Sequence, residues 1–355
     1  MTLIEFFDQE AIDNAMGALL LKPERLVILY AEKSCDIFVS ALEKVLEKRS
    51  IKTEIFAERV DISTVETAKV KLEEIVERFA DCDFDISGGN DIILVAIGSV
   101  AKKYNLPLHI VDVKNQSVKA VNSDREYKVA DVKIGVNELI DLYGGRCSNE
   151  SREKESCTWA RSIDGEKDIE AVWDICKKDP PAWNGAMGKS KSIGTDKHAA
   201  VWARLKRAGL VRGDGDNMRY KNSLVRYLLS RQGTALEMYT FICAKETGTF
   251  DDGQSGALLD WKGRREVENE IDVLLCRGAV GYFISCKNGM VDSTELYKLS
   301  TVANRFGGRY AKKILVLSSF EPDRSFMARA DELGITVIKN VRYLQKKDFV
   351  KRLSV

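Results

Sequence analysis

The sequence is poor in histidine, proline and paired cysteine, and each shortage argues against a class of protein. Two histidines and eight scattered cysteines without a C-x-x-C spacing argue against a zinc site. The unpaired thiols and the lack of an amino-terminal signal peptide predict a reducing, cytoplasmic location. Five prolines and no low-complexity run argue against long disordered segments. No apolar run approaches the roughly 18 residues that a membrane helix needs.

The charge of the chain is balanced overall but unevenly distributed. Lys and Arg number 55 against 54 Asp and Glu, so the net charge is +1. Residues 189–226, however, hold ten basic residues and three acidic ones. This window predicts a surface that faces a polyanion. The 355 residues are enough for two or three domains, and 45% hydrophobic content is enough for packed cores.

The first 145 residues alternate between two kinds of hydrophobic pattern. Short apolar runs at 2–7, 25–30, 52–56, 84–86 and 108–113 predict strands, and the amphipathic stretches between them at 11–21, 37–48, 64–79 and 92–103 predict helices. Strands that alternate with helices indicate a parallel, Rossmann-like sheet in an α/β domain. Ligands of such sheets bind beyond the carboxyl ends of the strands.

Three loops follow predicted strands at that edge: residues 8–10, 32–34 and 87–91. Gly88 and Gly89 would let the backbone approach an anion closely, and the following helix would offer free N–H groups. The alternative is an ordinary strand-to-helix turn in which Asn90 or Asp91 caps the helix. The dinucleotide fingerprint G-x-G-x-x-G is absent. His109 lies inside an apolar strand, so we expect it in the core.

Residues 146–230 predict a connector. A helix over 198–211, a glycine-rich hairpin over 212–220 and a helix over 223–230 suggest a winged-helix-like unit. Its basic face could contact nucleic-acid phosphates without sequence preference. The alternative is a solvated helix face in a connector that only relays the state of the first domain.

Residues 231–355 show the order helix, three strands, helix, strand. The runs 267–275 and 282–289 are separated by Arg277-Gly278 and predict a hairpin. Asp272 and Lys287 would then project from neighbouring strands, about 4.8 Å apart. Such a pair is either a surface ion pair or part of a metal-dependent phosphodiesterase site, in which the carboxylate holds a divalent ion and the lysine orients water or phosphate.

This part of the chain resembles the restriction-endonuclease-like PD-(D/E)xK superfamily. Ser285 stands where that superfamily usually has an acid, and some members move the acid to the next helix, where Glu295 lies here. The resemblance implies a site that binds Mg²⁺ or Mn²⁺ through Asp272, supported by Glu237 and Glu295. Glu270 shares a strand face with Asp272 and is an alternative ligand, and Glu268 is another. Arg264, Arg265, Lys298, Arg305 and Arg309 are candidate contacts to a nucleic-acid backbone.

The amino-terminal part resembles the CARF sensor domain of CRISPR ancillary nucleases, in its opening residues 3–8 and in the turn 85–90. In that family a CARF domain precedes a PD-(D/E)xK nuclease. The resemblance implies a homodimer that binds a cyclic oligoadenylate, expected to be cyclic tetraadenylate, and cleaves DNA or RNA in type III CRISPR antiviral defence. The ring would contact residues of the three loops, namely Asp8, Gln9, Lys33, Ser34, Ser87, Gly88, Gly89, Asn90 and Asp91.

The resemblance therefore predicts a sensor over residues 1–145, a connector over 146–230 and a nuclease over 231–355. Ser285 leaves a second interpretation open: a ligand-sensing, nucleic-acid-binding regulator with an inactive nuclease fold. A third is a repair or restriction nuclease with an unrelated nucleotide sensor, whose activity would need no activator.

Overall fold

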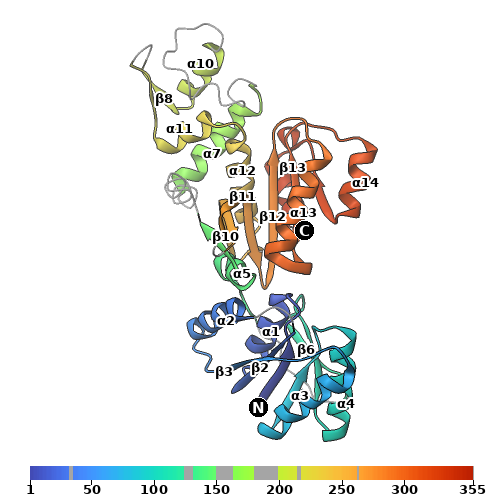
Figure 1. Cartoon of the computed structure of the whole chain (residues 1–355). Helices are drawn as coiled ribbons and strands as arrows, with labels where there is room; N and C mark the ends of the chain where they lie inside the picture. Colours follow the sequence, from blue (N-terminus) through green and yellow to red (C-terminus); the bar gives the residue numbers. More distant parts are fainter. Residues whose placement is uncertain are drawn as a thin grey trace.

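The computed structural model describes residues 1–31, 35–123, 131–148, 163–179, 199–213, 217–261 and 264–354. Two six-stranded sheets, each covered by helices, are stacked end to end, and a smaller helical unit lies beside the second sheet (Figure 1). The expected α/β class is therefore confirmed. Among the described residues, no helix is both long and apolar enough to span a bilayer.

The first sheet is Rossmann-like. Its strands are β1 (Thr2–Phe6), β2 (Arg25–Tyr30), β3 (Glu54–Arg59), β4 (Cys82–Asp85), β5 (Leu108–Asp112) and β6 (Ser117–Ala120), in the order β3-β2-β1-β4-β5-β6. The first five run parallel, and β6 pairs antiparallel with β5. The helices between them are α1 (Ala11–Leu21), α2 (Asp36–Lys48), α3 (Val65–Arg78) and α4 (Asp91–Tyr104).

Central strand β1 shows why this sheet has helices on both faces. All five of its residues are buried, as expected for a parallel strand covered on both sides. Leu3 packs in a cluster with residues of α1 and α2, whereas Ile4 packs with residues of α3 and α4. His109 on β5 is 0% exposed, so the prediction of a core histidine is confirmed.

The second sheet has the strand order β14-β13-β12-β11-β10-β7. It contains β7 (Gly145–Ser148), β10 (Asp252–Trp261), β11 (Arg264–Arg277), β12 (Val280–Lys287), β13 (Lys312–Leu317) and β14 (Ile335–Ile338). Strands β10, β11 and β12 pair antiparallel, and β12, β13 and β14 pair parallel. The hairpin predicted around Arg277-Gly278 is confirmed as β11–β12, and Gly278 has the positive φ of 58° that such a tight turn favours.

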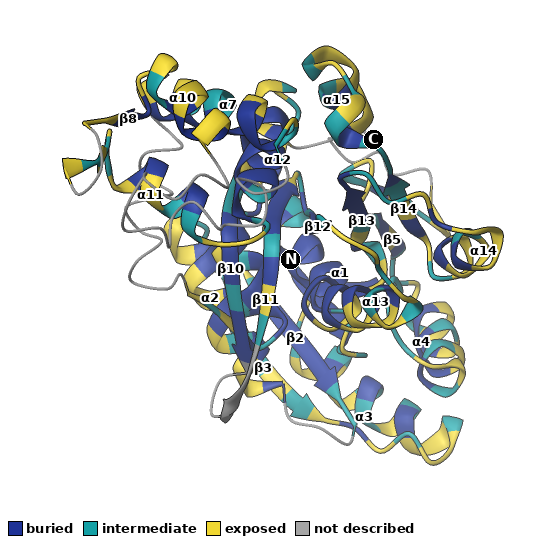
Figure 2. Cartoon of the chain, turned by 90° about the horizontal axis from the view of Figure 1, so that it is seen from above, coloured by how far each residue is buried: buried dark blue, intermediate teal, exposed yellow. Residues whose placement is uncertain are grey.

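Successive residues of strand β11 face helices on opposite sides of this sheet. Val273 and Leu275 cluster with residues of α12 (Thr234–Glu246), whereas Leu274 and Cys276 belong to the cluster that includes α13 (Ser293–Gly307). Figure 2 shows α12 buried over most of its length. The carboxy-terminal elements are the short η3 (Gly308–Tyr310), α14 (Arg324–Glu332), η4 (Val341–Tyr343) and α15 (Lys346–Leu353).

The smaller unit contains α7 (Ile163–Cys176), α10 (Ala199–Arg207), the ribbon β8 (Val211–Arg212) and β9 (Arg219–Tyr220), and α11 (Ser223–Ser230). Helix α10, the two-stranded ribbon and helix α11 follow one another in the order helix, hairpin, helix that the sequence predicted for residues 198–230. Trp173 and Trp202 are buried in its core. Trp173 also stacks on Tyr239 of α12 at a centroid distance of 4.7 Å, so the unit is anchored to the second sheet.

Helix α5 (Val136–Leu142) joins the two sheets (Figure 1). Glu138 accepts hydrogen bonds from Lys48 at 2.7 Å and from Arg49 at 2.8 Å, both at the end of α2. A single hydrophobic cluster runs from α1 and α2 through α5 to α13. The two sheets therefore share a continuous core and are not joined by a flexible linker alone.

Candidate active site

A polar pocket opens on the α13 face of the second sheet, at the end of the hairpin that is remote from its turn. The pairing of Val273 with Ile284 places Asp272 opposite Ser285, and Lys287 follows two residues later on the same face. The pocket has a volume of about 320 Å³. Its polar lining is made by Asn269, Glu270, Asp272, Ser285, Lys287, Glu295 and Lys298. Residues from two strands and one helix are thus brought together as the hairpin predicted.

Asp272 is held in place by the neighbouring strand. Its Oδ2 accepts a hydrogen bond from the Cys286 backbone N–H at 2.5 Å and another from the Ser285 hydroxyl at 3.1 Å. Burial raises the pKa of the Asp272 carboxyl, and the nearby Lys287 ammonium opposes that rise. Ser285 therefore has a physical role here, because its hydroxyl orients the carboxylate.

Lys287 lies between two carboxylates. Its Nζ is 2.9 Å from Glu295 Oε2, and Lys298 Nζ is 2.8 Å from Glu295 Oε1. Burial alone would lower the pKa of Lys287, but Asp272 and Glu295 outweigh it and raise the pKa, so Lys287 is held as a cation. The hydrogen bond from Lys298, with help from Lys287, lowers the pKa of Glu295. The Lys287 ammonium is thus fixed between the carboxyl groups of Asp272 and Glu295, and Lys298 holds Glu295 from the other side.

The acids of the pocket fit a hard divalent ion but do not form a dense ligand cluster. Among the described residues, no group of three or more His, Cys, Asp or Glu side chains is arranged to hold a metal. Mg²⁺ is commonly bound by one or two carboxylates and several waters. Asp272 with Glu270 or Glu295 supplies that donor set, and all three line the same pocket.

Glu237, predicted to support the metal, is not brought to this pocket. It lies in the first turn of α12, which packs on the opposite face of the sheet through residues that cluster with Cys286. The Glu237 charge contributes to the raised pKa of the Cys286 thiol, after burial and Asp272. That thiol points to the α12 face, where it contacts the Thr240 hydroxyl. The sequence located the helix but could not show which face of the sheet it covers. The side chains of residues 264–268, which include Glu268, lie outside the described structure.

Two of the three predicted ring-binding loops, at residues 8–10 and 87–91, meet at the carboxyl edge of the first sheet. Asp8 Oδ2 accepts a hydrogen bond from the Gly89 N–H at 3.0 Å, so the loops after β1 and β4 touch. Ser87 donates through its N–H and its hydroxyl to Asp85 Oδ1, at 2.8 Å and 2.5 Å. The alternative helix-cap role is confirmed for Asn90, whose side chain accepts from the Ile93 N–H at 3.0 Å.

The remaining predicted loop residues are placed only in part. Gln9 and Asp91 are exposed beside this junction, and Gln9 has a positive φ of 78°. Lys33 and Ser34 lie outside the described residues. The Gly89 amide that we expected to meet a phosphate already binds the carboxylate of Asp8, so a phosphate at that amide would have to displace Asp8.

Several residues of this edge were not singled out from the sequence. Asp85 is buried directly beneath Ser87, and burial raises its pKa to about 7 although the hydrogen bonds from Ser87 oppose the shift. Asp13 is 1% exposed in α1, where an acid within an otherwise apolar helix was the available signal. Arg59 lies at the end of β3 and lines a cavity of about 750 Å³ with Ala31, Asp61 and Ser63. This cavity extends the edge toward β3.

The basic residues of the connector that the structure describes are mostly exposed, whereas Lys189, Lys191 and Lys197 lie outside the described residues. Arg212 and Arg219 are directly opposite each other on β8 and β9, and both are exposed. Like charges in that position destabilise a two-stranded ribbon. Arg204 and Lys221 are instead paired, with Asp179 and Asp168. The ribbon, more than the helix, therefore keeps uncompensated positive charge.

Comparisons with known proteins agree with this geometry. Residues 223–354 match the family model described as "Card1-like, endonuclease domain", which begins at α11 and contains every residue of the polar pocket. Among curated proteins, none matches the chain in sequence.

Two solved structures share the fold over nearly the whole chain. Protein VC1899 from Vibrio cholerae is 19% identical, with a TM-score of 0.76, and the match covers 99% of this chain and 97% of that one. Can2 from Sulfobacillus thermosulfidooxidans, solved in complex with cyclic tetra-adenylate, is 18% identical with a TM-score of 0.73, over 100% and 99% of the two chains. Residues 223–354 are thus similar to a Card1-like endonuclease domain, and the whole chain has a fold like that of Can2, in agreement with the resemblance that the sequence shows.

Proposed function

We propose that this protein is a metal-dependent endonuclease that is switched on by a cyclic oligoadenylate, with cyclic tetraadenylate as the expected ring, and that it cleaves DNA or RNA in type III CRISPR defence. The observation that carries the proposal is the pocket of Asp272, Ser285, Lys287 and Glu295 within a Card1-like endonuclease domain. The Can2 structure, which has the same fold and contains cyclic tetra-adenylate, supports the choice of activator.

The chemistry of the pocket suits phosphodiester hydrolysis. A divalent ion held by Asp272 with Glu270 or Glu295 would lower the pKa of bound water and polarise the phosphate. Lys287 is kept protonated by its acidic neighbours, so it is suited to orient the attacking water or to offset charge that develops on the phosphate oxygens. Ser285 and the Cys286 N–H hold the carboxylate of Asp272 in the geometry that this requires.

The sensing part would use the carboxyl edge of the first sheet. A ring with internal two-fold symmetry is matched by a homodimer in which each subunit offers the same half-site. In each half-site the loops at residues 8–10 and 87–91, which already contact each other, would meet the ring, and Arg59 would supply positive charge on the β3 side.

The division of labour along the chain follows from these placements. We assign sensing to residues 1–145, connection to 146–230 and cleavage to 231–355, with two links across the boundaries. Strand β7, from residue 145 onward, pairs with β10 in the nuclease sheet, and the Card1-like match already begins at residue 223. The sensor and the nuclease are therefore structurally interdependent.

Nucleic acid would be gripped in part by the ribbon of the connector. The opposed Arg212 and Arg219 repel each other in the free protein, and phosphates placed between them would relieve that repulsion. Contacts of this kind do not depend on sequence, so they fit a nuclease that attacks foreign nucleic acid broadly.

The test is a cleavage assay with Mg²⁺ or Mn²⁺ on labelled single- and double-stranded DNA and RNA, with and without cyclic tetraadenylate. Wild-type protein should cleave at least one substrate faster with the ring, and Asp272→Asn and Lys287→Ala should not. Binding of nucleic acid without any product would instead indicate the regulator with an inactive nuclease fold. Cleavage at the same rate without the ring would indicate a repair or restriction nuclease.

A further inference from the structure

A three-residue segment of the nuclease contacts both candidate ring loops of the sensor. This segment, η3 (Gly308–Tyr310), directly follows α13. The Arg309 N–H donates to Glu10 Oε2 at 3.1 Å, in the loop after β1. The Arg309 guanidinium donates to the Ser87 carbonyl oxygen at 3.3 Å, in the loop after β4. Arg309, expected from the sequence to contact the substrate backbone, is thus held at the sensor.

The charge balance of this junction depends on the same arginine. Arg309 Nη2 is 2.7 Å from Asp13 Oδ2, and the Tyr310 hydroxyl donates to Asp13 Oδ1 at 2.8 Å. Asp13 is 1% exposed on its side chain, whereas Arg309 is 47% exposed. A buried carboxylate that loses its cation is strongly destabilised, so Arg309 is firmly tied to α1.

Gly308 shows how closely the segment fits against the sensor. Its φ is +61°, and a Cβ at this position would lie 2.0 Å from the Tyr143 hydroxyl and 2.4 Å from Glu10 Oε2. Because no side chain can be accommodated there, the backbone of the segment lies directly on the Glu10 loop. A movement of the Glu10 or Tyr143 side chain therefore changes the packing against this segment.

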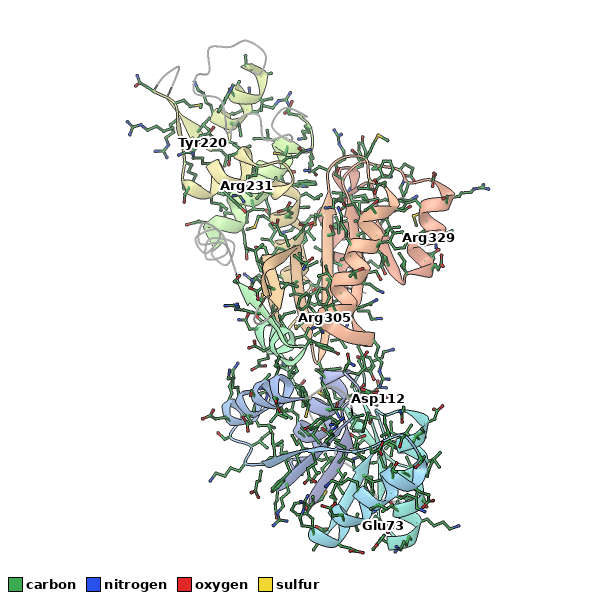
Figure 3. All side chains as sticks on the ribbon, in the orientation of Figure 1. Glu73, Asp112, Tyr220, Arg231, Arg305 and Arg329 are labelled. Atoms are coloured by element: carbon green, nitrogen blue, oxygen red, sulfur yellow. The ribbon has the colours of Figure 1, made fainter. Side chains whose placement is uncertain are left out.

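Helix α13 connects this junction to the catalytic pocket. Its first turn contains Glu295, which pairs with Lys287, and its far end, near the labelled Arg305, leads into η3 (Figure 3). Helix α13 continues for twelve positions after Glu295, to Gly307, which is about 18 Å along a helix, and Arg309 follows two residues later. The helix is packed on the shared core through Leu296, Leu299, Ala303 and Phe306, so it moves as one body.

We propose that Arg309 is the positioning residue through which the ring-binding loops of the sensor control Glu295 and Lys287, with α13 as the rigid connection. The inference rests on the proposed function, since it names the route by which ring binding would reach the nuclease. Coupling of this kind requires one element whose position both sites influence, and α13 together with the η3 turn that follows it contacts both.

The experiment compares wild type, Arg309→Ala and the control Arg329→Ala in the full-length protein. Arg329 is an arginine of the same half of the chain, on α14 (Figure 3), with a similarly exposed side chain (43%) that pairs with Glu332 and not with the sensor. The activation ratio is the cleavage rate with saturating cyclic tetraadenylate divided by the rate without it. Ring affinity is measured by calorimetry in an Asp272→Asn background, where no cleavage occurs.

We expect Arg309→Ala to lower the activation ratio about tenfold or more, while the unstimulated rate and the ring affinity stay within about threefold of wild type. Arg329→Ala should match wild type. An unchanged ratio in Arg309→Ala would overturn the inference, and so would an equal loss in Arg329→Ala. Loss of ring binding would make Arg309 a ligand contact and would also overturn it. If Arg309→Ala does not fold, the double variant Asp13→Asn/Arg309→Ala is used in its place. The double variant removes the buried carboxylate that Arg309→Ala leaves without its cation.

A wild-type protein that binds the ring poorly or is not accelerated by it would reject the proposed function before any variant is compared. The two failures are therefore distinguishable.

Discussion

Replacement of Asp272 by asparagine should separate the activity of this protein from its stability. Asparagine has the same shape, and its Oδ1 can still accept the hydrogen bonds from Ser285 and the Cys286 N–H. What is lost is the negative charge, which the proposed chemistry needs to hold a divalent ion beside Lys287. We expect cleavage to fall by about 10³-fold, equivalent to about 4 kcal/mol of transition-state stabilisation.

The free energy of unfolding should change little in Asp272→Asn, and any change should be a small increase. Burial raises the pKa of the Asp272 carboxyl in the folded protein, so the ionised form costs folding free energy at pH 7. A raised carboxyl pKa means that this contribution to stability is present at low pH and is lost as pH rises through the folded pKa. Asparagine does not ionise and avoids that loss. The neutral asparagine accepts a weaker hydrogen bond from the Cys286 N–H than the carboxylate does, and this offsets about 1 kcal/mol of the gain in stability.

The assay pairs cleavage rates with thermal unfolding at pH 6 and pH 8, and uses Asp331→Asn, an exposed acid in the last turn of α14, as the control. The variant at Asp272 should unfold at the wild-type temperature or above it at both pH values. Cleavage within tenfold of wild type, or a marked fall in unfolding temperature without loss of activity, would refute the role that we give to Asp272.

Three further predictions concern stability and binding. Glu138→Gln should lower the free energy of unfolding by up to about 3 kcal/mol at pH 7, because Arg49 and Lys48 outweigh burial and lower the Glu138 pKa to about 2. Measured by urea unfolding, this loss should shrink below about pH 4.5 and vanish near pH 2. Glu5→Gln should stabilise the protein at pH 8 more than at pH 5, by roughly 1 kcal/mol or more, because Glu5 is fully buried and its pKa is raised well above the usual range by burial and by Asp85; lower stability at pH 8 would contradict this. Arg212→Ala and Arg219→Ala should each weaken nucleic-acid binding in fluorescence anisotropy and reduce the slope of log affinity against log salt by about 0.7–0.9, whereas an unchanged slope would remove the ribbon from the binding surface.

The elements that carry the site were predictable because their signals are local. The turn at Arg277-Gly278 and the apolar runs on either side specify a hairpin, and the hairpin brings Asp272 and Ser285 together. The alternation of strands and helices over the first 113 residues specifies a parallel sheet, and with it the edge at which Asp8 and Gly89 meet.

The features that were not predictable depend on distant partners. Strand β7 has the sequence Gly-Arg-Cys-Ser, which carries no strand pattern, and it is a strand because it pairs with residues 258–261 of β10. The position of Glu237 depends on which face of the sheet α12 covers, and a helical pattern cannot specify that. Arg309 was predicted to contact the substrate backbone, and only the structure shows that it pairs with Asp13, which is buried in the sensor.

The most direct test of the central claim is the rate at which wild-type protein cleaves labelled nucleic acid in Mn²⁺ as cyclic tetraadenylate is added. The account predicts a saturable increase in rate that disappears in Asp272→Asn. A rate that does not depend on the ring, or an increase that survives in Asp272→Asn, would contradict it.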